Sequence, residues 1–181
     1  PRFAPGQPVP CLSLPGLSPE VRGIWSLWQI TLHTPDGDFY RVMPLFRQGD
    51  GRILAPTARF VWDQMLTSVE TPEIHLEGDE AREAFRLVES SAREHGEEIY
   101  RELVQRHRTR LALEREKLEY AFAARRRAIE RIGLPAVRDH RLTQLAAEEQ
   151  QWREVHERKS EGSPELVPLL LVRVDGGGAD E

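Results

Sequence analysis

The chain has 181 residues, of which 39% are hydrophobic and 30% are charged, and its formal net charge is −5 at pH 7. The apolar fraction is below the ~45–50% of an average globular domain and the charged fraction is above ~25%, so we expect much solvated surface. The negative net charge argues against a protein that binds nucleic acid over its whole surface, and any such contact must therefore be local.

Targeting and redox features are few. No apolar run approaches the ~20 residues of a membrane-spanning helix, and the N-terminus lacks the pattern of a secretory signal, so we expect a cytoplasmic protein that does not contact a membrane. The single cysteine, Cys11, can form neither an internal disulfide nor a cysteine metal site. The chain begins at Pro1 without an initiator methionine, which favours a fragment of a longer protein.

Residues 1–23 are predicted to be a proline-rich approach to the first ordered element. Prolines and glycines interrupt this segment too often for a helix. Order is expected from Ile24, because residues 24–34 are rich in aromatic and branched side chains, and residues 35–38 supply turn chemistry before Phe39–Phe46. This pattern predicts two antiparallel strands.

The rest of the predicted α+β lobe, residues 24–76 and 164–175, adds one helix and two short strands. Pro56 opens the helix, which we expect to cover the sheet and to end at Pro72. Strands are predicted at Glu73–Leu76 and at the apolar Leu166–Val174, followed by a disordered tail at residues 176–181. The expected inner residues of the helix are Phe60, Val61, Met65 and Leu66.

Residues 77–163 are predicted to form a long antiparallel helical hairpin that resembles a coiled coil and protrudes as an arm. Apolar residues recur at spacings of three, four or seven, which indicates a seam along a long helix. Gly96 predicts a kink or break, since glycine inside a helix costs about 1 kcal/mol, and the register drifts between Leu103 and Leu111. The helices are expected to turn at Gly133-Leu134-Pro135. The predicted seam is Phe85, Val88, Ala92, Ile99, Leu103, Leu111, Leu118, Phe122, Ile129 and Ile132, facing Leu142, Leu145, Ala146, Trp152 and Val155.

No catalytic motif is found. The sequence has no phosphate-binding G-x-x-x-x-G-K-[ST] loop, no G-x-G-x-x-G and no H-E-x-x-H, and its histidines and glutamates do not repeat as a di-metal helical bundle requires. We therefore expect no catalytic residue, no metal site and no cofactor. The class that remains is a regulatory or interaction module.

Arginines gather around the predicted turn of the hairpin. Three consecutive arginines spread around most of a helix circumference, so they cannot all be buried and must present charge to solvent. Two interpretations stay open: a contact to phosphate or to an acidic protein, or a solvated surface compensated by nearby carboxylates. A second group of arginines, Arg106, Arg108 and Arg110, lies farther down the helix, and the candidate contact residues at the turn are Arg125, Arg126, Arg127, Arg131, Arg138 and Arg141.

The run from Ile24 to Val174 resembles the C-terminal domain of bacterial Swi/Snf-type, RapA-like ATP-dependent helicases or translocases. The resemblance is carried by Met43-Pro44-Leu45-Phe46, by Asp50-Gly51-Arg52, by Ala58-Arg59-Phe60-Val61-Trp62, and by the segment from Gly133 to Leu142. Trp152 and the closing strand at Leu169–Val174 complete it. These are packing and turn residues, and the chain departs from the pattern in its proline-rich start and its arginine triplet.

The resemblance implies that this chain is a non-catalytic regulatory or interaction domain of an ATP-dependent motor. Its implied partners are the motor domains of the parent chain and either double-stranded DNA or RNA polymerase; phage-defence ATPases of similar architecture fit equally. The alternative is a free-standing coiled-coil module, in which a second copy covers the apolar seam and the chain forms a homodimer.

Overall fold

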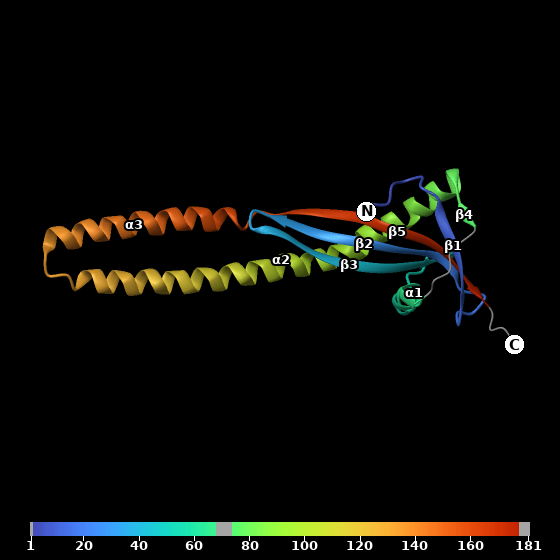
Figure 1. The fold of residues 1–181 in the computed structure, drawn as a ribbon, viewed down its shortest axis with the longest axis horizontal. Helices are drawn as coiled ribbons and strands as arrows, with labels where there is room; N and C mark the ends of the chain where they lie inside the picture. The colour runs from blue at the N-terminus through green and yellow to red at the C-terminus, as the bar shows by residue number, and fades with distance from the viewer. Residues whose placement is uncertain (1, 68–73, 178–181) are drawn as a thin grey trace. The chain divides into compact units, whose positions relative to one another are not determined.

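The computed structural model describes residues 2–67 and 74–177, which form five strands and three helices in α+β order (Figure 1). The predicted α+β class, with a sheet, a covering helix and a helical hairpin, is confirmed. The chain divides into two compact units. The sheet unit holds the residues up to 31, residues 40–100 and those from 164 onward, and the hairpin unit holds residues 32–39 and 101–163.

The sheet has the strand order β3-β2-β5-β1-β4. Its strands are β1 (Val9–Pro15), β2 (Arg22–Thr34), β3 (Gly37–Gln48), β4 (His75–Leu76) and β5 (Ser163–Gly177). A two-residue turn joins β2 to β3 and makes them antiparallel. By contrast, β1 is parallel to β5, with Cys11 opposite Arg173, and antiparallel to β4, with Val9 opposite Leu76.

The expectation of an antiparallel sheet was therefore wrong in one respect, because the sheet is mixed. Its parallel strand, β1, lies inside residues 1–23, where no strand was predicted. Val9 and Leu14 of β1 are buried, yet Pro8, Pro10 and Pro15 hide the alternation in the sequence. Proline is tolerated here because β1 lies next to the two-residue edge strand β4.

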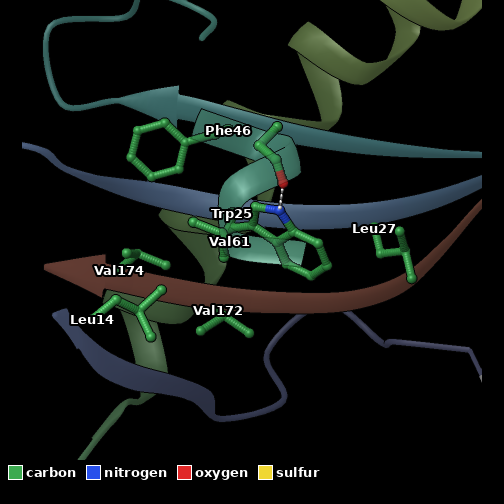
Figure 2. Packing of buried hydrophobic residues seen from close by; sticks show 8 residues of the cluster. Leu14, Trp25, Leu27, Phe46, Val61, Val172 and Val174 are labelled. Carbon is green, nitrogen blue, oxygen red and sulfur yellow. Dashed lines mark hydrogen bonds between the residues drawn. The ribbon is translucent and has the colours of Figure 1, made fainter. Parts of the chain in front are cut away.

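Helix α1 (Ala55–Thr67) covers one face of the sheet. Figure 2 shows the core on this side, where Trp25, Phe46 and Val174 from three strands gather with Val61 of α1. The indole Nε1 of Trp25 donates a hydrogen bond to the carbonyl oxygen of Ala58 at 2.8 Å, so the helix is fixed to the sheet by polar contact as well as by packing.

The predicted inner side of α1 was only partly correct. Val61 is fully buried and Met65 packs against the core, but Leu66 is 70% exposed. Leu66 follows Met65 directly, so the helix rotates it about 100° away from the buried side. The predicted stop at Pro72 and the start of the strand at Glu73 lie outside the described residues.

Helix α2 (Gly78–Glu130) packs its first part on the opposite face of the sheet. The ring centroids of Trp28 and Phe85 lie 6.0 Å apart, and Trp28 is three residues from Trp25, so the two indoles point to opposite faces. Residues 78–100 belong to the sheet unit, although the sequence had assigned them to the arm.

The helix runs without a break through Gly96, where a kink or break was predicted. A Cβ at Gly96 would lie 3.4 Å from Cδ1 of Ile30 on β2. The helix therefore passes close to β2 at Gly96, at a distance that would still leave room for a methyl group.

In the hairpin unit, the remainder of α2 runs antiparallel to α3 (Pro135–Arg158), as Figure 1 shows. Leu103, Leu111 and Phe122 are buried on α2 and Leu145 is buried on α3, as predicted. The ring centroids of Phe122 and Trp152 lie 6.1 Å apart.

Two predicted seam residues of α3 were wrong: Ala146 is exposed and Val155 is 46% exposed. The less exposed positions of α3 alternate at spacings of four and three, as in a coiled coil, and several of them are polar. The positions are Arg138, Leu142, Leu145, Glu149, Trp152 and His156, and the spacing continues at Lys159 directly after the helix.

Candidate functional site

The turn between α2 and α3 is formed by residues 131–134. Leu134 is the extended N-cap residue of α3, and Pro135 occupies the first helical position, where its missing N–H costs nothing. Gly133 has open space around its Cα. The turn therefore lies where the sequence predicted it, and it places the ends of two arginine-bearing helices next to each other in the chain fold.

The three consecutive arginines are all exposed, as predicted, but two of them contact α3. Arg125 Nη1 lies 2.7 Å from Glu148 Oε2, and Arg126 Nη2 donates to Glu149 Oε2 at 2.5 Å. Glu149 also accepts from Arg153 at 2.6 Å, and its side chain is only 13% exposed. These two arginines therefore brace the hairpin, and the guanidinium of Arg125 additionally lies 5.9 Å from the Phe122 ring.

Three other candidate arginines have no such partner. Within the described chain, no carboxylate pairs with Arg127, Arg131 or Arg141, and all three are exposed. Arg127 lies in the last turn of α2, and Arg131 directly follows the helix, which ends at Glu130. The sixth candidate, Arg138, is half-buried and lies 3.5 Å from its neighbour Asp139. We call Arg127, Arg131 and Arg141 the open arginines.

Charge is concentrated at this end of the hairpin. Residues 125–141 contain six arginines and two carboxylates, Glu130 and Asp139, so their formal net charge is +4 in a chain whose total is −5. Leu134 is 67% exposed and Val137 is 40% exposed in the same segment. The surface is thus basic with a small apolar part, and it can bind an anionic partner through guanidinium forks.

A second polar cluster, which the sequence analysis missed, joins the two helices to the β2–β3 turn within the hairpin unit. His107, only 6% exposed, accepts or donates at both ring nitrogens: Nε2 lies 2.7 Å from the carbonyl oxygen of Lys159 and Nδ1 lies 3.3 Å from Arg110 Nη2. Arg110 in turn lies 3.2 Å from Asp36 Oδ2 and 4.7 Å from the centroid of the Phe39 ring.

Lys159 completes this cluster between two carboxylates. Its Nζ lies 3.0 Å from Glu114 Oε1 and 3.5 Å from Asp36 Oδ1. The hydrogen bond to Glu114 raises the pKa of the Lys159 ammonium, and the charge of Asp36 adds to this effect against the opposing cost of burial. The cations of this cluster pair with its carboxylates. It therefore stabilises the hairpin and is not a candidate binding site for a charged ligand.

A sequence signal for His107 was present. It lies four residues after Leu103 and four before Leu111, and it therefore occupies the seam position where the apolar register seemed to drift. In the second arginine group, Arg110 belongs to the cluster and Arg106 lies 3.9 Å from Glu102. Arg108 is exposed, with no ion pair to another described residue.

The described residues contain no group of three or more histidine, cysteine, aspartate or glutamate side chains arranged to hold a metal ion. Among the described helices, none combines the length and apolar character needed to cross a bilayer. Comparison with family models, with curated proteins and with solved structures found no match to this chain.

Proposed function

We propose that this chain is a non-catalytic interaction domain whose helical hairpin binds the phosphate backbone of double-stranded DNA through the open arginines. The observation that carries the proposal is the segregation of charge, with a formal +4 over residues 125–141 against −5 for the chain. A local basic surface on an acidic protein fits a partner that must be engaged at one place only.

The pairing pattern supports a contact role for part of the arginine cluster. Arg125 and Arg126 have carboxylate partners on α3 and stabilise the hairpin, whereas the open arginines have none among the described residues. Solvated arginines with no internal partner can neutralise phosphates without first breaking an ion pair.

In this proposal the chain is a cytoplasmic regulatory appendage of a Swi/Snf-type, RapA-like ATP-dependent translocase. The resemblance to that family implies a second binding partner, the motor domains of the parent chain. The alternative partner to DNA is a protein, RNA polymerase. In that case the open arginines would bind acidic side chains instead of phosphates. The packing of α3 on α2 favours a monomeric domain, because Leu145 and Trp152 already cover the α2 seam within the chain.

The test is the affinity of this chain for a fluorescently labelled DNA duplex, measured by anisotropy at low salt. Replacing Arg127, Arg131 and Arg141 by alanine removes the open arginines, and we expect an affinity loss of at least about tenfold, equal to 1.4 kcal/mol. The matched control replaces three exposed arginines elsewhere, Arg41, Arg86 and Arg108. Equal losses in both variants would show only a general charge effect and would refute the assignment to the hairpin turn.

A further inference from the structure

Three arginines from neighbouring strands lie on the same face of the sheet, the one that α2 covers. Phe46, Trp25 and Val172 point to the α1 face (Figure 2), and side chains alternate along a strand. Arg47 follows Phe46 and Arg173 follows Val172, so both point to the α2 face. Arg22 lies three residues before Trp25 and shares that face.

These arginines line one cavity of about 210 Å³ in the sheet unit. The strand order β3-β2-β5 makes their three strands adjacent, so the three arginines reach one pocket from neighbouring strands. The other residues that line it are Gly23, Ile24, Gln48, Gly49 and Leu87. We call this space the arginine cavity.

The chain supplies too little negative charge to balance the cavity. Asp175 Oδ2 lies 3.4 Å from Arg173 Nε, and Asp175 is the one described carboxylate that forms an ion pair with any of the three arginines. Three guanidinium charges and one carboxylate leave a formal +2. Like charges on adjacent strands repel each other, and so this arrangement favours an anion that the chain does not provide.

We propose that the arginine cavity binds a phosphate group, either as inorganic phosphate or as the phosphomonoester of a small molecule. A phosphomonoester carries a charge of about −1.5 to −2 near pH 7, which matches the +2 of the cavity better than the single charge of a backbone phosphodiester does. Guanidinium forks are suited to phosphate oxygens because they donate two parallel hydrogen bonds.

The size of the cavity limits the ligand. Its volume is below the ~300–1,000 Å³ of pockets that bury drug-sized molecules, so it can enclose a phosphate group with a small substituent, and any larger part of a ligand would lie outside it. This site is separate from the open arginines and does not depend on the proposed DNA contact.

Titration calorimetry with inorganic phosphate and with phenyl phosphate, at constant ionic strength set by chloride, tests the proposal. We expect saturable binding by the unchanged chain and a loss of at least about tenfold for Arg22→Gln/Arg47→Gln, because each guanidinium provides a charge-assisted hydrogen bond. The control, Arg41→Gln/Arg59→Gln, removes two exposed arginines outside the cavity and should bind as the unchanged chain does.

Circular dichroism establishes whether each variant is folded. If the double variant does not fold, the single variant Arg22→Gln replaces it, because Arg22 is exposed. Absence of phosphate binding by the unchanged chain, or equal binding by the cavity variant, would overturn the proposal. So would a loss of duplex-DNA binding in the cavity variant without any phosphate binding, since that outcome assigns the arginines to a nucleic-acid backbone. Phosphate binding should persist when Arg127, Arg131 and Arg141 are replaced. That result would show that the phosphate does not bind at the hairpin.

Discussion

His107 of α2 is joined to Lys159, just after α3, by a hydrogen bond of 2.7 Å between its Nε2 and the Lys159 carbonyl oxygen. A carbonyl oxygen can only accept, so Nε2 carries the proton and Nδ1 is left to accept from Arg110 at 3.3 Å. This arrangement fixes one neutral tautomer of a nearly buried ring. It ties together two segments that are 52 residues apart in sequence.

Replacing His107 by phenylalanine should destabilise the hairpin unit by about 1–3 kcal/mol. The aromatic ring fits beside Phe39, but the Lys159 carbonyl oxygen loses its donor and Arg110 loses its contact with Nδ1. Urea denaturation followed by circular dichroism measures the change. His140→Phe is the matched control, because His140 is exposed on α3, and it should change stability by less than about 0.5 kcal/mol. Equal effects of the two substitutions would contradict the role given to His107.

Replacing Lys159 by methionine should destabilise the same unit by about 1–2 kcal/mol, because Glu114 would lose its ion-pair partner and Asp36 would keep only Arg110. Lys117→Met is the control, since Lys117 is exposed and is the only other lysine.

The Lys159 contribution should also depend on pH. The folded-state pKa of Lys159 is raised above 10.5, so its stabilising effect is complete below the ordinary lysine value and disappears as pH rises through the folded-state value. The stability difference between the unchanged chain and Lys159→Met should therefore shrink at strongly alkaline pH. A difference that stays constant there would argue against the ion pairs.

The same substitution at two glycines should have opposite effects. Gly23→Ala would place a Cβ 2.2 Å from the backbone oxygen of Arg47 and should cost about 1–3 kcal/mol. Gly96→Ala would meet the side chains of Ile30 at 3.4 Å and Leu166 at 3.8 Å, both at ordinary contact distance, and should gain up to about 1 kcal/mol from helix propensity. Melting temperatures of the two variants give the signs directly. A destabilised Gly96→Ala would mean that the helix and β2 are packed too closely for a methyl group.

The chain should be a monomer, because α3 covers the α2 seam within the same molecule. Light scattering should give a mass near 20.8 kDa over a range of concentrations. Leu145→Ala should lower the free energy of unfolding by about 2–5 kcal/mol without any concentration dependence, as expected for a buried leucine in an intramolecular seam. A mass near twice that value, or stability that rises with concentration, would favour the homodimer.

Much of the fold could be predicted from residue patterns. The β2–β3 pair followed from aromatic and branched residues around Pro35–Asp38, and the hairpin from apolar spacing around Gly133 and Pro135. Strand β1 could not be predicted, because its prolines obscure the alternation and its partner, β5, is about 160 residues away. Contacts at such separations are set by tertiary packing and leave little local signal.

The site was less predictable than the fold. The sequence identified the arginine cluster, but it could not separate Arg125 and Arg126, which pair with α3, from the open arginines. That division depends on which glutamates of α3 face α2. A polar seam residue such as Glu149 cannot be told from a solvent-exposed one by the spacing of apolar residues. The arginine cavity was missed because Arg173 of β5 lies far along the chain from Arg22 and Arg47 of the β2–β3 pair.

The most direct test of the central claim is the salt dependence of duplex-DNA binding by the unchanged chain and by the variant with alanine at Arg127, Arg131 and Arg141. Each phosphate neutralised contributes a slope of about −0.9 in a plot of log affinity against log salt concentration. If each open arginine neutralises one phosphate, the variant should have a slope smaller by about 2.7 than that of the unchanged chain. Equal slopes, or no salt-dependent binding by the unchanged chain, would contradict the proposed DNA contact.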